Sequence, residues 1–297
     1  MPSKRWLWAQ SGAVWSTLHF LDGQLRATAG EMRRKLDTRA IGLDAGLEFI
    51  RWVTGAENLH YGLWDGLDVS AGNLRAAQDA YTEKLFSHMP KGQLRILDIG
   101  GGAGETAAKL LALGHAVQIV VPSSLLAARC RANAPNAQVH ECKFEEFNTI
   151  DRFDLCLFSE SFQYVPLKFG LSKALSLLND GGEVLIADCF RSEAFQGSGE
   201  GGITGGGHPI GAFRAELSRQ PLKVISEEDI TASVAASIDL EQGLFNVIGY
   251  ALSRVDIELK EKRPGTRWFL HRALRLFLND RPAVPPERTD PQQRGLH

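Results

Sequence analysis

The chain has 297 residues, of which 44% are hydrophobic and 23% are charged, and its formal net charge is −2. This composition is ordinary for a soluble globular protein, and the balanced charge gives no overall basic field for nucleic acid. The length suits one large domain or two small ones. No run of about 18 apolar residues is present, so no membrane-spanning helix is expected.

The first residues lack the pattern of a secretory signal peptide. Lys4 and Arg5 precede a mixed stretch that residues 10–12 interrupt, and no apolar core follows. The four cysteines lie between residues 130 and 189, with no CxxC pair and no histidine at ligand spacing. Neither a metal site nor a disulfide framework is expected, and we predict a cytoplasmic protein.

Residues 1–90 predict an N-terminal helical cap. Apolar residues recur at helical spacing between Leu36 and Ile50, and glycines punctuate the chain from residue 55 to residue 72. Five of the six tryptophans lie in this region. Aromatic residues gathered outside a core domain suit a cover over a substrate.

Residues 91–190 alternate between strand-like and helix-like segments. Strands are predicted at 94–99, 116–121, 138–142, 153–158 and 183–188, with helices at 105–113, 125–133 and 171–178. Strands separated by helices form right-handed crossover units, which give a parallel sheet covered on both faces. The predicted fold class is therefore α/β, with a mostly parallel sheet, an N-terminal helical cap and C-terminal helices.

The central domain is predicted to extend over residues 91–230. It includes a glycine-rich loop at 197–207, which is either a lid over a pocket or a disordered loop. A helix at 210–218 and a strand at 222–226 follow. No clear strand comes after residue 226, and an uncovered sheet edge would favour a homodimer.

The C-terminal part divides into two predicted segments. Residues 231–281 have long helical patterns, and residues 282–297, rich in Pro, Arg and Gln, are expected to be disordered. From Lys260 to Arg281 the helical pattern is basic and amphipathic. Such a helix can lie on an anionic membrane surface, or it can pack on the domain with a solvated basic face.

The most informative segment runs from Asp98 through four glycines to Glu105. There a strand ends, the chain turns, and a helix begins. Only glycine allows positive φ and so close an approach of backbone to ligand. A dinucleotide fingerprint that starts at Gly100 would need its third glycine at position 105, where the carboxylate would repel the pyrophosphate. No Gly-Lys-Ser/Thr follows, so a P-loop is excluded as well.

The pattern that remains, with Asp98, Gly100, Gly102 and Gly104, resembles the first motif of class I S-adenosylmethionine (SAM)-dependent methyltransferases. The resemblance implies a Rossmann-like fold whose glycine turn wraps the methionine part of SAM, with the acidic residue near the amino group. A glycine turn without a ligand is the alternative. The cofactor-binding residues implied are Asp98, Gly100, Gly101, Gly102, Gly104, Ser123, Phe144 and Ser159.

Four further segments carry the resemblance. Residues 153–165 look like the fourth strand and active-site loop of that family, and residues 177–186 look like its turn into strand five. Residues 222–231 resemble the sixth strand of small-molecule members. Residues 59–65 are similar to the segment before the core in sterol, tocopherol and cyclopropane-fatty-acid type enzymes, where an aromatic residue helps close the pocket over the sulfonium.

Two positions depart from the family pattern. The second strand usually ends in an acidic residue that binds the ribose hydroxyls, but Pro122 stands here, and Ser123 or Ser124 would have to substitute. Lys143 stands where an Asp usually accepts from the adenine amino group, although Phe144 could still stack on the ring. These departures leave a second hypothesis open: a protein that binds SAM without methyl transfer, or that uses the pocket for another reaction such as cyclisation.

Methyl transfer needs alignment more than a dedicated catalytic group, because a base is required only when the acceptor carries a proton. Glu160, which follows the fourth strand, is a candidate base or substrate ligand, and otherwise an exposed loop carboxylate. Tyr61 and Tyr164 are candidates to line the pocket, or else core residues. His208 is the best imidazole candidate, though a loop histidine is more often plain surface.

The ends of the chain indicate the kind of partner. Trp6, Trp8 and Trp15 near the N-terminus, together with the basic helix near the C-terminus, favour a small and apolar substrate and a weak contact with a membrane surface. No nucleic acid partner is expected. The acceptor atom, whether O, N or C, is left open.

Overall fold

The computed structural model describes residues 38–193 and 207–278. Their contacts divide the chain at Gly243: the described residues up to this position form a first unit, and those from Leu244 form a second. The two units are described separately. The Trp-rich first 37 residues, the glycine-rich segment at 194–206 and the predicted tail lie outside the described residues.

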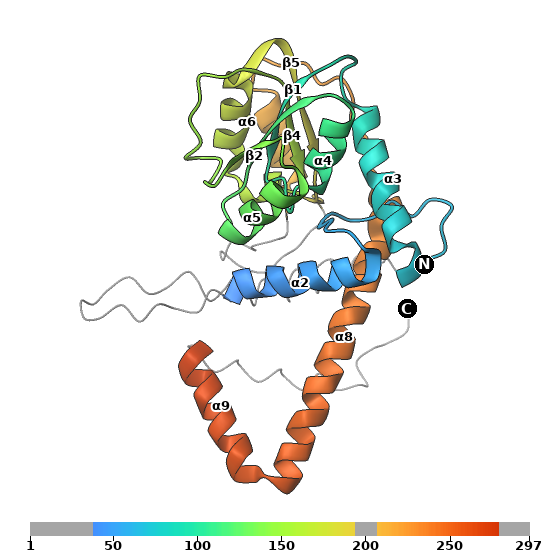
Figure 1. Cartoon of the computed structure of the whole chain (residues 1–297), viewed down its shortest axis with the longest axis vertical. Helices are drawn as coiled ribbons and strands as arrows, with labels where there is room; N and C mark the ends of the chain where they lie inside the picture. The colour runs from blue at the N-terminus through green and yellow to red at the C-terminus, as the bar shows by residue number, and fades with distance from the viewer. Residues whose placement is uncertain (1–37, 194–206, 279–297) are drawn as a thin grey trace, which may run out of the picture. The chain divides into compact units, whose positions relative to one another are not determined.

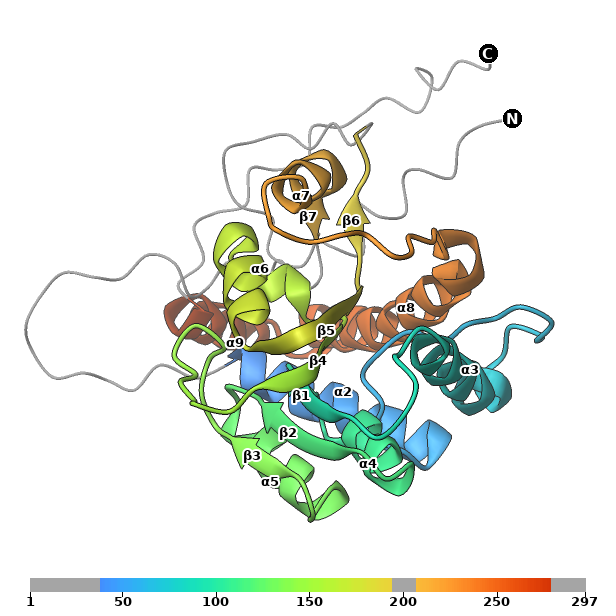
Figure 2. The same ribbon diagram turned by 90° about the horizontal axis from the view of Figure 1, so that it is seen from above.

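The first unit is built on a five-stranded parallel sheet in the order β3-β2-β1-β4-β5 (Figure 2). The strands are β1 Arg95–Ile99, β2 Ala116–Val120, β3 Gln138–His140, β4 Phe153–Ser159 and β5 Leu178–Ala187. This order confirms the predicted α/β class, and every pairing in this sheet is parallel. The turn into strand five, predicted within residues 177–186, falls inside β5, where the pairing with β4 shifts register.

Helices cover both faces of the sheet, with α4 and α5 on one side and α6 on the other (Figure 2). The helices of the described residues are α2 Thr38–Thr54, η3 Ala71–Asn73, α3 Leu74–Ser87, α4 Glu105–Ala112, α5 Ser124–Asn133, η4 Phe162–Tyr164, α6 Leu167–Ser176, α7 Ile210–Leu217, α8 Thr231–Lys262 and α9 Pro264–Leu278. In the region predicted as an N-terminal helical cap, α2, η3 and α3 are helical whereas residues 55–70 form no helix, and the cap and its boundaries stay a prediction.

Two hydrophobic clusters explain the continuous apolar runs of the strands. Ile96 and Leu155 face the cluster that α3, α4 and α5 cover, while Leu97 and Phe158 face the cluster that α6 and α7 cover. These four side chains are fully buried. Because successive side chains of a strand point to opposite faces, a strand covered on both sides must be apolar throughout. Each such burial stabilises the fold by about 1.5–3 kcal/mol.

The predicted strand at 222–226 is wrong. Residues 221–230 form no helix or strand, and the side chains of Val224 and Ile225 are 50% and 72% exposed. The β-branched residues favour an extended chain, but no neighbouring strand or core contact buries them. Instead β6 (Phe190–Arg191) and β7 (His208–Pro209) form a short parallel ladder of their own. Among the described residues β5 is an edge strand, so the homodimer stays a prediction.

The second unit holds the later part of α8 and the whole of α9, which form a helical hairpin that turns at Arg263 (Figure 1). The earlier part of α8 belongs to the first unit, where Ser237 accepts a hydrogen bond of 2.8 Å from the indole Nε1 of Trp64. Of the helices that the structure describes, none is long and apolar enough to span a bilayer.

Candidate functional site

The glycine turn joins β1 to α4 in a backbone conformation that other residues rarely adopt. Gly100, Gly102 and Gly104 have φ values of 78°, 55° and 90°. A Cβ on Gly100 would lie 2.4 Å from Cβ of Ser161, and one on Gly104 would lie 2.9 Å from Cα of Cys130. The turn therefore requires glycine for its φ angles and for its close packing.

The remaining side of the turn is open to a ligand. A Cβ on Gly101 would meet the Asp98 carboxylate at 2.5 Å, so Gly101 leaves room for that side chain. At Gly102 the nearest neighbour of an added Cβ would be a methyl group of Leu59, at 3.8 Å. The space beside Cα of Gly102 is thus open except for Leu59, which is in ordinary van der Waals contact with it.

Asp98 is a buried acidic side chain without a hydrogen-bond partner among the described residues. It is 1% exposed, and neither carboxylate oxygen has a hydrogen-bond partner among the described residues. Burial raises the pKa of this carboxyl group to about 7. A buried carboxylate without a donor is costly, and a cationic donor would relieve that cost. The position therefore fits an ammonium group, as the predicted contact with the amino group of SAM requires.

Residues 57–61, called the cover loop below, run across the glycine turn. At one end the backbone N–H of Glu57 donates to Oε1 of Glu105 at the start of α4, at 3.0 Å. At the other end the backbone N–H of Tyr61 donates to Oε1 of Glu160 after β4, at 2.8 Å. Leu59 lies between these anchors. Leu59, the first residue of the segment 59–65 predicted to close the pocket, therefore lies against the glycine turn, and the closing role of an aromatic residue stays a prediction.

A buried ion pair holds the first end of the cover loop. The carboxylate of Glu57 lies against α5, where it accepts hydrogen bonds from Arg129 at 3.1 Å and from Asn133 at 2.8 Å. Asn133 also donates to the carbonyl of Ala103 in the glycine turn, at 3.0 Å. Sequence reasoning missed this anchor, because its members are more than 70 positions apart and carry no local motif.

Glu160 has the strained backbone expected of a functional position. Its φ of 54° makes it the non-glycine residue with positive φ in the part of the chain that the structure describes. Its N–H donates to the carbonyl of Ala187 at 2.7 Å, and its side chain is half-buried against the cover loop. Strain of this kind persists only where the surroundings enforce it, and it concentrates at active sites. The structure brings Glu160 and Tyr61, two of the predicted catalytic candidates, close together.

Two further residues beside Glu160 were missed. Asp188 directly follows β5 and accepts N–H bonds from Gln163 at 2.9 Å and Cys189 at 2.7 Å, while burial raises its pKa to about 6. Tyr81 on α3 is 4% exposed, and burial, with the nearby charge of Glu160, raises its pKa well above the usual value. Asp188 could have been found from sequence, because it ends the predicted fifth strand just as Glu160 follows the fourth.

His60 is a buried and neutral part of the cover loop. Its ring stacks on Tyr81 at 4.8 Å, Nδ1 lies 2.8 Å from the carbonyl of Tyr61, and Nε2 lies 3.2 Å from the hydroxyl of Thr82. Burial lowers its pKa to about 4. The imidazole therefore positions the cover loop against α3 and carries no charge at neutral pH.

The other two catalytic candidates lie around the loop after β4. Nε2 of His208 is 3.2 Å from the carbonyl of Phe162 and 3.0 Å from that of Val165, and its ring packs edge-on against Phe162. Because this nitrogen contacts two backbone carbonyls, His208 holds the loop after β4 in place. Tyr164 lies in η4 and is 51% exposed.

The three remaining cofactor candidates differ in their surroundings. The hydroxyl of Ser123 caps α5 by accepting from the N–H of Leu126 at 3.4 Å. Phe144 is 4% exposed and packs edge-on against Phe158. Ser159 ends β4, and its buried hydroxyl has no hydrogen-bond partner among the described residues. Their contacts with a cofactor stay predictions.

Comparisons with known proteins agree with this geometry. Residues 96–182 match the family described as "Methyltransferase domain". Among solved structures, the [4+2]-cyclase SpnF has a TM-score of 0.58 at 18% identity, covering 76% of this chain and 90% of its own. Geranyl diphosphate C-methyltransferase from Streptomyces coelicolor A3(2) has a TM-score of 0.57 at 14% identity, covering 81% and 89%.

A third relative is a putative sarcosine dimethylglycine methyltransferase from Galdieria sulphuraria. Its TM-score is 0.55 at 19% identity, covering 80% of this chain and 92% of its own. At identities this low the three likenesses establish the fold, while the family match covers the stretch from β1 into β5 that holds the glycine turn.

Proposed function

Because the chain contains a class I SAM-dependent methyltransferase domain, we propose that it is an enzyme that transfers a methyl group from SAM to O, N or C of a small, apolar molecule. One observation carries the proposal. A buried carboxylate without a hydrogen-bond partner, Asp98, lies beneath the glycine turn that the cover loop crosses. A folded chain leaves such a group unsatisfied at a cost, which a bound ligand can remove.

The residues present fit SAM. Asp98 would hold the ammonium group, and the peptide groups from Gly100 to Gly104 would lie along the methionine part, under Leu59. When bound, SAM would supply an electrophilic methyl group on its sulfonium for in-line transfer to the acceptor, with S-adenosylhomocysteine as the leaving group. The contribution of the chain is to align the acceptor and to exclude water, and alignment alone is worth about 7–11 kcal/mol.

Two carboxylates flank the place where an acceptor would lie. Glu160 and Asp188 directly follow Ser159 and Ala187, which are paired neighbours at the ends of β4 and β5. The raised pKa of Asp188, about 6, brings its proton affinity near neutral pH, where a general base is most effective. Either carboxylate could take the proton of an O–H or N–H acceptor, and an acceptor without a proton would need neither.

The test is calorimetric titration of the full chain with SAM and with S-adenosylhomocysteine. Asp98→Asn removes the charge beneath the turn, and Asp180→Asn, an exposed carboxylate in the β5 turn, is the matched control. We expect the first variant to weaken binding by about 10–100-fold, the worth of a hydrogen bond to a charged group, and the control to leave it unchanged. No binding of either compound to the wild type at millimolar concentration would refute the proposal.

A second candidate function is a reaction other than methyl transfer in the same pocket. It is favoured by the end of β2, where Pro122 offers no acceptor and the Ser123 hydroxyl already caps α5, so no carboxylate is available for the ribose. One structural relative is named a [4+2]-cyclase. Incubation of the full chain with SAM carrying a labelled methyl group and a panel of apolar acceptors separates the two. Label in the product supports methyl transfer, and conversion of an acceptor without label supports the alternative.

A further inference from the structure

The hairpin of the second unit exposes an unusual number of large apolar side chains. Five lie on the later part of α8 and three lie on α9, and Phe269 is 65% exposed. The eight residues are Val247, Tyr250, Leu252, Val255, Ile257, Trp268, Phe269 and Leu270. Single exposed apolar residues are common on proteins, but a gathering of this size on two connected helices indicates a binding surface.

The orientation of α9 explains why its apolar side is exposed. Arg267 forms a two-pronged ion pair with Asp256 of α8, with distances of 2.8 and 2.9 Å, and His271 lies 2.8 Å from the same carboxylate. These two residues are one helical turn apart, so that side of α9 faces α8. At 100° per residue, Phe269 lies on the opposite side of α9, away from α8, and Trp268 and Leu270 flank it.

The hairpin is positively charged, although the whole chain is not. Residues 244–278 contain seven Lys or Arg and three Asp or Glu, whereas the chain has a net charge of −2. The α9 helix contains no acidic residue. Among the described residues Lys260, Arg263 and Arg272 have no ion-pair partner. Arg272 instead lies over the ring of Trp268, 5.5 Å from its centre.

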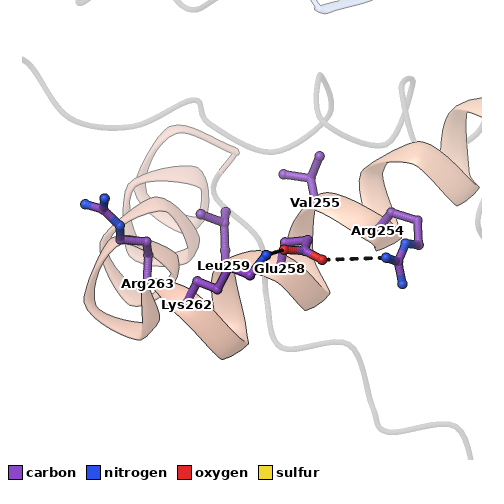
Figure 3. A pocket seen from close by; sticks show the side chains of 6 residues that line it. All are labelled: Arg254, Val255, Glu258, Leu259, Lys262 and Arg263. Atoms are coloured by element: carbon purple, nitrogen blue, oxygen red, sulfur yellow. Dashed lines mark ion pairs between the residues drawn. The ribbon is translucent and has the colours of Figure 1, made fainter.

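A shallow groove on the hairpin combines the same two properties (Figure 3). It is lined by Arg254, Val255, Glu258, Leu259, Lys262 and Arg263. The one carboxylate, Glu258, is neutralised by ion pairs with Arg254 and Lys262. Apolar side chains in a groove with three cations and one carboxylate suit a molecule with an acyl chain and a negative head group.

We propose that the α8–α9 hairpin docks on the surface of an anionic lipid bilayer. Phe269 and Leu270 would enter the boundary between head groups and acyl chains, while Arg263 and Arg272 bind the head groups. A second copy of the chain is disfavoured as the occupant, because two positively charged hairpins repel each other. A nucleic acid would attract the cations but would leave the apolar side in water. This inference goes beyond the proposed function and does not depend on it.

Co-sedimentation of the full chain with lipid vesicles tests the inference. We expect binding to vesicles that contain phosphatidylglycerol, little binding to pure phosphatidylcholine, and release at high salt, because the surface potential of the bilayer is screened. Failure to bind phosphatidylglycerol vesicles at low salt would overturn the proposal. Equal binding to both vesicle types would overturn the part that assigns a role to the cations.

Two paired variants locate the contact. Phe269→Ser with Leu270→Ser should weaken vesicle binding by about tenfold or more, and the same change at Val69 and Ile150, exposed apolar residues of the first unit, should not. Arg263→Glu with Arg272→Glu should weaken it by a similar factor, unlike Lys91→Glu with Lys223→Glu. Circular dichroism checks that each variant keeps its helices. A wild-type dimer in solution that the Phe269 variant converts to monomer would instead assign this side to a second copy.

Discussion

The carboxyl ends of β1 and β2 are neighbours in the sheet, yet they differ in whether their polar side chains have hydrogen-bond partners within the chain. At the end of β1, Asp98 is buried with no hydrogen-bond partner, beneath a glycine turn that leaves open space at Gly102. At the end of β2, Pro122 has no polar side chain and the Ser123 hydroxyl is used to cap α5. The end of β1 therefore leaves a polar group for a ligand, whereas the hydroxyl at the end of β2 is hydrogen-bonded within the chain. Four variants test this difference.

Gly100→Ala should produce the largest effect. Its φ of 78° strains any other residue, and the new Cβ would meet Ser161 at 2.4 Å, so we expect a loss of about 2–5 kcal/mol of unfolding free energy. Gly114→Ala is the control, because Gly114 has a φ of 90° with open space around it and should lose only the strain, about 1–2 kcal/mol. Urea unfolding measures both, and equal losses would mean that the turn is not tightly packed.

Asp98 should make the stability of the ligand-free protein depend on pH. Its pKa is raised from 3.8 to about 7 in the folded state, so its protonated form favours folding. The stability it contributes is present below about pH 4 and is lost as the pH rises through 7. Relative to Asp98→Asn, the wild type should lose about 2–4 kcal/mol across that range. Urea unfolding at several pH values measures the difference between the two proteins, and parallel curves would refute the assignment.

Leu59→Ala tests whether the cover loop contributes to binding at the end of β1. Leu59 is only partly buried, so the truncation should remove about 1 kcal/mol of contact with a bound cofactor, or roughly a fivefold rise in the Kd of S-adenosylhomocysteine. Val69→Ala, at an exposed position of the same unit, serves as the comparison. An unchanged Kd for the Leu59 variant would show that the cover loop does not lie over the ligand.

Ser123→Ala tests the end of β2, where the hydroxyl is hydrogen-bonded within the chain. This variant should have the smallest effect on stability and binding. Loss of the cap on α5 should cost about 1 kcal/mol of unfolding free energy. The Kd of S-adenosylhomocysteine should stay the same, since the hydroxyl is already used within the chain. A clear rise in that Kd would restore the prediction that Ser123 binds the ribose, and would remove the contrast between the two strand ends.

Local patterns predicted the sheet well and its last strand badly. Runs such as 94–99 and 153–158 are apolar because both of their faces are buried, and that burial follows from the helices between them in the sequence. The run at 222–226 has the same residue types, but Val224 and Ile225 are exposed. Residue type indicates that a segment can be extended, and only the presence of a neighbour makes it a strand.

The candidate site also contains some residues that the sequence could predict and others that it could not. The glycine turn and Glu160 could be predicted because each directly follows a strand, and parallel strands bring their ends to one edge of the sheet. The ion pair of Glu57 with Arg129, and Tyr81 on α3, could not be predicted, because their partners are distant in the chain.

By itself, then, the sequence determined the parallel α/β arrangement and the glycine turn, since both follow from the order and spacing of neighbouring residues. Only the tertiary structure decided that the cover loop crosses the turn, that Asp98 lacks a partner and that α9 turns its apolar side away from α8. These features depend on contacts between segments far apart in the chain. Such contacts are selected by burial and charge in three dimensions, and no local pattern records them.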